Sequence, residues 1–133
     1  MRSNLLVVAP ALNEELAIGS VVTWLRQLSF DVLVIDDCST DRTAFIARQS
    51  GATVLSLPVN LGVGGALRTG FRYAVSRGYT EVVQVDADGQ HPVHQIVDPI
   101  DAAVRLKAHL IISCRYLSSE STLDSSSIRR ISM

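Results

Sequence analysis

The chain has 133 residues, of which 47% are hydrophobic, and its 12 basic and 13 acidic residues leave a formal net charge of -1. This length fits one compact domain, and the composition is too apolar and too weakly charged for a disordered chain. The charge balance excludes a general basic field for nucleic acid, and no apolar run approaches the ~20 residues that would span a bilayer.

The two cysteines, Cys38 and Cys114, show no metal-binding spacing. They are also too few for a secreted disulfide scaffold, so we expect reduced thiols in a cytoplasmic protein. The N-terminus lacks a basic segment followed by a long apolar run and a cleavage site, which argues against a signal peptide.

Apolar runs of strand length alternate with segments of helical period along the chain. Such alternation is typical of a mostly parallel sheet with helices on both faces. We therefore predict a single α/β domain over residues 1–133, with three layers, α/β/α. The predicted strands are Leu5–Ala9, Asp31–Ile35, Thr53–Leu57, Glu81–Val85 and Leu110–Ser113. The predicted helices are Leu16–Leu28, Thr43–Gln49, a segment ending near Arg77, and Pro92–Leu106.

Acidic residues follow three of the predicted strands, at the point where each strand ends. The carboxyl ends of parallel strands share one edge of the sheet, where open α/β folds bind ligands. Repulsion makes such a cluster costly unless a cation or hydrogen-bond donors offset it, so the arrangement suits a metal ion and a nucleotide. The residues are Glu14 and Glu15, Asp36 and Asp37, and Asp86 and Asp88.

The pair Asp86 and Asp88 is the sharpest of these signals. Two carboxylates two residues apart at a strand exit suit one divalent ion, and oxygen ligands favour Mg²⁺ or Mn²⁺. Gln90 and His91 follow directly and are candidates to complete the shell. The alternative is a turn in which Asp86 caps the next helix. The position after a strand favours the metal site.

The other two acidic loops combine structural and functional roles. We expect Thr40 or Asp41 to cap the next helix, and Asp36 or Asp37 to contact a ligand, because two adjacent acids have no obvious structural need. Glu15 suits a helix N-terminus, where negative charge is favourable. Glu14, facing the shared edge, is interpreted as functional.

A glycine-rich segment, Asn60–Gly65, is predicted to be a turn that lets the next helix pack closely and contributes some diphosphate contact. Gly62 and Gly64 begin a dinucleotide-binding pattern that Leu67 breaks, and the lysine of a P-loop is missing. The phosphate signal is therefore weak. Arg68, in the first turns of this helix, is interpreted as a solvated side chain, with a phosphate contact as the alternative.

Five segments together resemble the family 2 glycosyltransferases, and most closely the polyprenyl- and dolichyl-phosphate sugar synthases. The resemblance covers nearly the whole chain, from about Leu5 to Arg130. The segments are V-V-A-P-A-L-N-E-E, V-I-D-D-C-S-T-D-R-T, N-L-G-V-G-G-A-L-R-T-G-F, V-D-A-D-G-Q-H-P and S-C-R-Y-L. Five motifs in register are improbable by chance. The resemblance implies the GT-A fold, which is Rossmann-like.

The resemblance also implies roles for individual residues. One loop contacts the nucleoside, a D-x-D motif holds the metal and diphosphate, and arginines face donor or acceptor phosphates. The implied nucleotide-sugar contacts are Pro10, Leu12, Glu14, Asp36, Asp37, Asp86, Arg129 and Arg130. The implied metal ligands are Asp86, Asp88 and Gln90, and the implied catalytic residues are Asp88 and Arg115.

The reaction implied is inverting transfer of a sugar from a UDP- or GDP-sugar to an acceptor, expected to be a polyprenyl phosphate. Mg²⁺ or Mn²⁺ would stabilise the leaving nucleotide. We expect no nucleic-acid partner, a place in the cytoplasm or at its membrane face, and membrane contact through a missing C-terminal part. The sequence gives no oligomeric state.

Two departures from the family pattern bear on this interpretation. The family's domain is longer, so the chain resembles its donor-binding half, and Cys38 and Gly89 replace residues common at their positions. One alternative is a non-catalytic nucleotide-binding or assembly module. Another is a nucleotidyltransferase, which would need a first loop rich in glycine and lysine, and Pro10–Glu15 contains neither.

Overall fold

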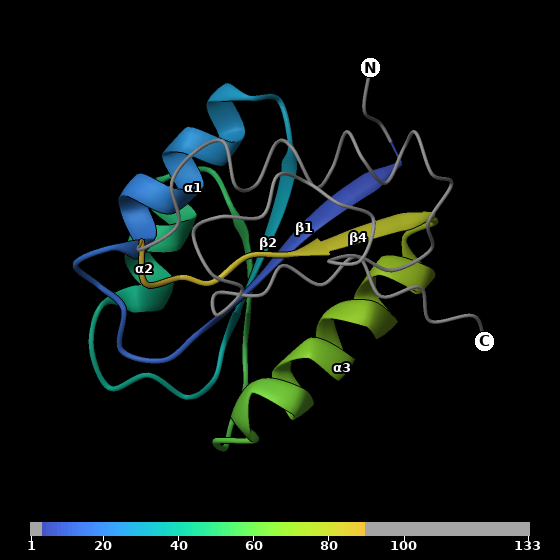
Figure 1. Ribbon diagram of the computed structural model, residues 1–133. Coiled ribbons are helices and arrows are strands. Elements are labelled where there is room, and N and C mark those ends of the chain that lie inside the picture. The colour runs from blue at the N-terminus through green and yellow to red at the C-terminus, as the bar shows by residue number, and fades with distance from the viewer. Residues whose placement is uncertain (1–3, 90–133) are drawn as a thin grey trace, which may run out of the picture.

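A computed structural model describes residues 4–89 of the chain (Figure 1). Within this range strands and helices alternate as predicted. The first strand runs two residues further than expected, and the first helix begins two residues later. The predicted Pro92–Leu106 helix and Leu110–Ser113 strand lie outside the described residues. The elements are β1 (Leu5–Ala11), α1 (Ile18–Gln27), β2 (Asp31–Asp36), α2 (Thr43–Gln49), β3 (Thr53–Ser56), α3 (Gly62–Ser76) and β4 (Glu81–Gln84).

The four strands form one parallel sheet in the order β3-β2-β1-β4. From β1 the chain moves outward through β2 to β3 and then returns to place β4 on the other side of β1. The order therefore reverses between β1 and β4, and open α/β sheets bind ligands outside the carboxyl ends of the strands at such a point. The parallel sheet predicted from the sequence is confirmed.

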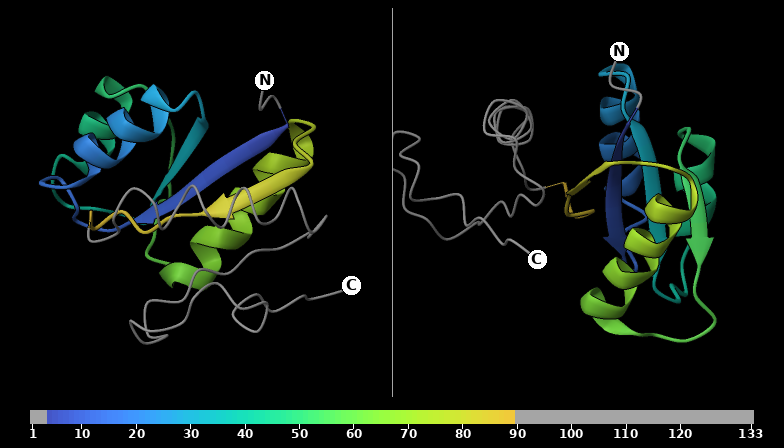
Figure 2. Two further views of the ribbon diagram at one scale, coloured as in Figure 1. Left: turned by 45° about the horizontal axis from the view of Figure 1, so that its top comes forward. Right: turned by 90° about the vertical axis from the view of Figure 1, so that its right-hand side faces the viewer.

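Helices cover both faces of this sheet, α1 and α2 on one and α3 on the other (Figure 2). Because side chains alternate along each strand, neighbouring residues serve opposite faces. Val7 and Ala9 pack under α1 and α2, whereas Leu6 and Val8 pack under α3. This confirms the three-layer α/β/α architecture.

The side of α3 that meets the sheet carries small residues. Ala66, Gly70 and Ala74 are its buried positions. A Cβ added to Gly70 would lie 2.6 Å from the Val8 Cγ1 atom, closer than side-chain carbons approach one another. The backbone of α3 is therefore held close to the strand, and Gly70 has no room for a larger residue.

The predicted turn at Asn60–Gly65 is wrong in its extent, because α3 already begins at Gly62. Gly62 has a φ of +77°, in the left-handed region that favours glycine. A Cβ on Gly65 would lie 2.5 Å from the Leu61 Cβ atom, whereas one on Gly64 would meet nothing within 4 Å. Of the three glycines in this segment, Gly62 is required by its backbone conformation and Gly65 by the lack of space for a side chain. Among residues 4–89 no helix is long and apolar enough to cross a membrane.

Candidate functional site

Three loops leave the same edge of the sheet at the carboxyl ends of β1, β2 and β4 (Figure 1). Backbone pairing continues to the start of two of them: the Asp37 N–H donates to the Ala11 carbonyl (2.9 Å) and the Val85 N–H to the Val8 carbonyl (3.0 Å). The sheet therefore carries the three acidic segments to one edge, as the sequence predicts.

The loop after β1 is tied to the loop after β2 by hydrogen bonds running in both directions, each between a backbone N–H and a side-chain oxygen. Asn13 has a φ of +53°, a left-handed conformation that asparagine tolerates. The two loops therefore form one bracket across the strand ends. N–H groups of Asn13, Glu14 and Glu15 donate to Ser39 Oγ, Thr43 Oγ1 and Asp41 Oδ2, and those of Thr40 and Arg42 donate to Asn13 Oδ1 and Glu15 Oε2, at 2.9–3.2 Å.

This bracket separates the roles of the two glutamates. Glu15 accepts from the Arg42 N–H (3.1 Å), and α1 begins only at Ile18, so the alternative that Glu15 places negative charge in the first turn of that helix does not hold. The half-buried Glu14 carboxylate has no hydrogen bond or ion pair to any residue in 4–89. Glu14 is thus the acid of this loop that the bracket does not use.

Asp41, rather than Thr40, caps α2, because its carboxylate accepts from the Thr43 N–H at 2.9 Å. Partial burial opposes ionisation of Asp41. Hydrogen bonds from the Thr43 hydroxyl, the Thr43 N–H and the Glu15 N–H outweigh that effect, and they lower the pKa of Asp41 below its ordinary value of 3.8. The cap and the bracket therefore share one ionised carboxylate.

Asp36 and Asp37 are both buried, each only 5% exposed. Asp36 accepts from the Ser39 N–H within its own loop (3.0 Å). The two oxygens of Asp37 accept from the Leu61 N–H (2.7 Å) and the Gly62 N–H (2.9 Å), where α3 begins. The expectation that adjacent acids have no structural need is therefore wrong, because Asp37 starts a helix on the far side of the sheet.

The D-x-D segment is fixed through its middle residue. Ala87 is 3% exposed and lies in the same buried cluster as Val85 and residues of α1. Gly89 follows with a φ of +71°, and a Cβ there would lie 3.4 Å from the Ala17 Cβ atom, so the turn closes against the start of α1. The half-buried Asp86 and Asp88 thus flank a buried anchor beside the first loop.

The donor set of this segment fits a hard divalent cation. Within residues 4–89 no group of three or more His, Cys, Asp or Glu side chains is placed to hold a metal ion. Mg²⁺, however, commonly takes one or two protein carboxylates and completes its shell with substrate phosphates and water. Asp86 and Asp88 supply such a pair.

A family model described as glycosyl transferase family 2 matches residues 6–131. The chain belongs to this family. The match confirms the family suggested by the five motifs, and the similar solved structures confirm the predicted GT-A fold. The members of this family act as glycosyltransferases.

Among curated proteins, the chain is 36% identical over 119 residues to an undecaprenyl-phosphate mannosyltransferase from Micrococcus luteus, covering 84% of this chain and 48% of the relative. It is 33% identical over 122 residues to the polyprenol monophosphomannose synthase of Mycolicibacterium smegmatis, covering 84% and 45%. The chain therefore spans about half the length of these curated relatives.

Among solved structures, the chain is similar to glucosyl-3-phosphoglycerate synthase from Mycobacterium tuberculosis in complex with Mn²⁺, UDP and glucosyl-3-phosphoglycerate. The TM-score is 0.61 at 34% identity, covering 76% of this chain and 39% of that one. The same enzyme has been crystallised with Mg²⁺ and UDP, again with a TM-score of 0.61. Structural relatives thus bind a nucleotide together with either cation expected here.

Two departures from the family pattern have a backbone explanation. Cys38, an exposed free thiol, has a φ of +68°, in the region that favours the glycine common at this position. Gly89 has a φ of +71°, a backbone conformation that glycine adopts more easily than other residues. Several predicted residues lie outside the described range and remain predictions: Gln90, His91, Arg115, Arg129 and Arg130.

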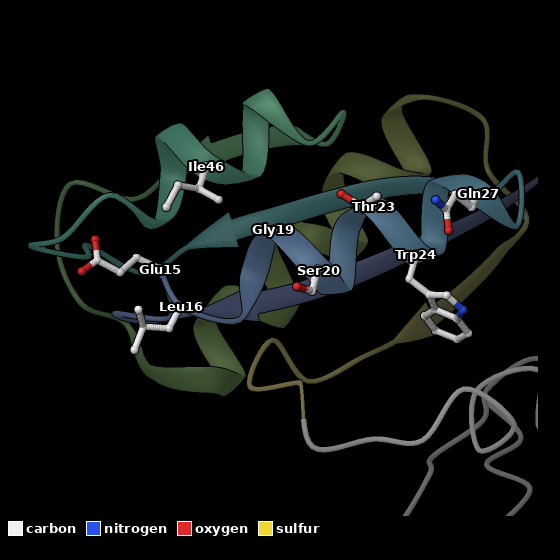
Figure 3. A pocket seen from close by; sticks show the side chains of 8 residues that line it. All are labelled: Glu15, Leu16, Gly19, Ser20, Thr23, Trp24, Gln27 and Ile46. Atoms are coloured by element: carbon white, nitrogen blue, oxygen red, sulfur yellow. The ribbon is translucent and has the colours of Figure 1, made fainter.

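An open groove of 550 Å³ lies elsewhere, along the outer flank of α1 (Figure 3). Only Glu15 and Leu16, at one end of it, belong to the loop after β1. The sequence did not single out this groove, and its mixed polar and apolar lining includes no residue of the D-x-D segment. Its lining residues are Glu15, Leu16, Gly19, Ser20, Thr23, Trp24, Gln27 and Ile46.

Proposed function

We propose that this chain is the donor-binding part of a glycosyltransferase that moves a sugar from a nucleoside-diphosphate sugar to a polyprenyl phosphate. The observation that carries the proposal is the D-x-D segment, anchored by Ala87 beside the first loop at the switch point of the sheet. The polyprenyl-phosphate relatives support the acceptor class, at 33–36% identity.

The nucleoside lies, in this proposal, against the loop after β1. Pro10 and the 43%-exposed Leu12 provide apolar contact, and Glu14 provides an acceptor that the loop bracket leaves unused. We assign the hydrogen bond to base or ribose to Asp36 rather than Asp37, because both oxygens of Asp37 already accept from the start of α3. The sequence left Asp36 and Asp37 as alternatives for this hydrogen bond, and the proposal selects Asp36.

The diphosphate lies at Asp86 and Asp88. With Gln90, these residues would hold Mg²⁺ or Mn²⁺, which offsets the charge of the departing nucleoside diphosphate. The chain's own contribution is to present two carboxylates on either side of the buried Ala87, at the end of the sheet where the diphosphate is proposed to lie. Asp88 and Arg115 are the proposed catalytic residues, with Arg115 facing a phosphate.

An acceptor phosphate is anionic at neutral pH and needs little help from a base to attack the anomeric carbon. Direct attack inverts the configuration at that carbon. Arg129 and Arg130 are proposed to face donor or acceptor phosphates, to which guanidinium groups donate bidentate hydrogen bonds. The proposal places this chemistry in the cytoplasm, at the membrane face where such an acceptor lies.

Calorimetry on the full 133-residue chain with UDP, GDP and their sugars, with and without Mn²⁺, tests donor binding. Asp88→Ala is expected to lower metal-dependent nucleotide affinity by more than about 10-fold, the lower end of what a perturbed metal site loses. Glu81→Ala is the matched control, since this exposed acid lies at the opposite end of β4. Equal affinity in the wild-type and Asp88→Ala proteins would refute the D-x-D assignment.

The nucleoside assignment needs a separate measurement without metal. Asp36→Asn is expected to weaken binding of a free nucleoside, whereas a loss confined to the diphosphate would refute the assignment. Product analysis then separates the remaining alternatives. A nucleotidyltransferase would release pyrophosphate, a glycosyltransferase would release the nucleoside diphosphate, and a binding module would release neither.

A further inference from the structure

Helix α3 has an unusual distribution of side-chain size. Its fully buried positions are alanines and a glycine, Leu67 and Tyr73 are half-buried against the core, and three large apolar side chains are exposed. Val63, Phe71 and Val75 are 61%, 39% and 79% exposed. Phe71 and Val75, four residues apart, form an exposed apolar ridge, whereas Leu67 packs against the core and Val63 shares the helical side of Ala66 and Gly70.

A second ridge beside it carries positive charge. Arg68 and Arg72 are four residues apart, and both are exposed. From residue 57 to residue 80 the sequence contains three arginines and no aspartate or glutamate, although the whole chain has a net charge of -1. The third arginine, Arg77, lies over the Tyr73 ring, 5.2 Å from its centre. Charge is thus segregated onto this segment of an otherwise balanced chain.

The helices on the other face of the sheet lack this combination. On α1 the residues Ile18, Val22 and Leu25 are buried. The exposed Phe45 of α2 lies beneath the Arg42 guanidinium, 4.9 Å from its centre. Single exposed apolar residues of this kind are ordinary, whereas a ridge of them beside cations marks an interaction surface.

We propose that the outer face of α3, formed by Arg68, Phe71, Arg72 and Val75, docks onto an anionic membrane surface. Guanidinium groups attract lipid phosphates, and each cation near an anionic leaflet strengthens binding several-fold. Apolar side chains beside them enter the boundary between headgroups and acyl chains. The absence of any acid between residues 57 and 80 removes the repulsion that would oppose this contact.

The position of α3 is compatible with such docking. Among the described residues α3 is the one helix on its face of the sheet, opposite α1 and α2 (Figure 2). Val59 and Leu61, which precede it, are 55% and 52% exposed and extend the apolar surface toward the carboxyl edge. The surface is separate from the donor site, so the inference goes beyond the proposed function and does not depend on it.

Co-sedimentation of the full chain with vesicles of neutral phosphatidylcholine, or of phosphatidylcholine mixed with phosphatidylglycerol, tests the surface. The double variant Arg68→Gln/Arg72→Gln is expected to lower partitioning onto the anionic vesicles by about 30-fold. Added salt should have a similar effect on the wild-type protein, because it screens the attraction. Phe71→Ser/Val75→Ser should lower partitioning by at least about 10-fold.

Matched controls come from the opposite face of the sheet. Arg48→Gln and Phe45→Ser remove the same kinds of exposed side chain from α2 and should leave partitioning unchanged. Thermal melts verify that each variant is folded. Equal losses in the control and α3 variants would overturn the proposal, as would wild-type protein that fails to sediment with anionic vesicles.

Two further measurements distinguish a membrane surface from a protein interface, and the docking proposal from the proposed function. If the α3 variants abolish self-association on a sizing column while vesicle binding is unchanged, the surface is a protein interface and the membrane proposal is wrong. Calorimetry with the nucleotide and Mn²⁺ should give the same affinity in the α3 variants as in the wild type. Vesicle binding that survives a failure of nucleotide binding would refute the proposed function and support the docking surface.

Discussion

The two faces of the sheet are covered in different ways. On one face, α1 and α2 fill the space above the strands with large side chains such as Ile18, Leu25 and the neighbouring Phe30. On the other, α3 meets the strands through Ala66, Gly70 and Ala74, and its backbone comes close to them. The first face gains its stability from buried apolar area, whereas the second depends on close fit.

The hydrogen bonds that hold the starts of the helices also differ between the two faces of the sheet. The loop that precedes α1 and the start of α2 share the bracket of hydrogen bonds, so loss of one bond leaves several others. The start of α3 is held by one buried carboxylate, that of Asp37, with a second contact from the Gly62 N–H to Asn60 Oδ1 (3.0 Å). The α3 face should therefore be the more sensitive of the two to single substitutions.

Asp37→Ala should have the largest effect. It removes two charge-assisted hydrogen bonds, leaving the Leu61 N–H without its acceptor and the Gly62 N–H with Asn60 Oδ1 alone, for a loss of about 2–4 kcal/mol in the free energy of unfolding. Denaturant unfolding monitored by circular dichroism measures it. Asp41→Ala is the counterpart on the other face, with a smaller expected loss, because the Asp41 carboxylate is less buried than that of Asp37 and water can replace its bonds. A larger loss for Asp41→Ala would reverse the comparison.

Gly70→Ala should come next. Alanine normally stabilises a helix by about 0.5–1 kcal/mol relative to glycine. Here its Cβ would lie 2.6 Å from the fully buried Val8 side chain, so overpacking should reverse the sign and cost about 1–3 kcal/mol. Gly64→Ala, in the same helix with open space around it, is the control and should stabilise the protein. If both substitutions stabilise it, α3 does not pack as closely as described.

The features that the sequence predicted correctly are those that depend on residues close together in the chain. Alternating apolar runs predicted the strands, and helical spacing with a terminal glycine predicted α2 to the residue. The placement of acids at strand ends followed from the parallel sheet alone. Each of these inferences needs only local pattern and topology.

Long-range hydrogen bonds account for what the sequence did not predict. Asp37 finds its partners 24 and 25 residues away, and Glu15 finds its partner 27 residues away. No spacing rule connects such positions. Asp37 accepts two hydrogen bonds at the start of α3, so the same unforeseen contact accounts for two errors, the structural role of Asp37 and the early start of α3 at Gly62. The outer face of α3 was missed because the helical period shows which residues share a side, but not which side is buried.

The smallest effect is expected at the opposite edge of the sheet, where Asp31 joins the two faces. Its carboxylate lies 3.4 Å from Arg26 Nη1 of α1 and accepts from the Tyr79 hydroxyl at 2.9 Å, just after α3. The arginine contact is exposed and contributes little. Tyr79→Phe removes the neutral donor and should cost about 0.5–1.5 kcal/mol in the free energy of unfolding at neutral pH.

The pH dependence of that loss identifies its cause. Burial, followed by the hydrogen bond to Asp31 and the charge of that carboxylate, raises the pKa of Tyr79 above its ordinary value of 10.0. Folding thus favours the protonated hydroxyl, so this stabilisation is complete below the unfolded-state pKa and is lost as the pH rises through the folded-state value. The gap between wild type and Tyr79→Phe should therefore narrow above about pH 10. A gap that stays constant into alkaline solution would mean that Tyr79 acts through packing alone, and that the hydroxyl does not link the α3 face to the strand that α1 covers.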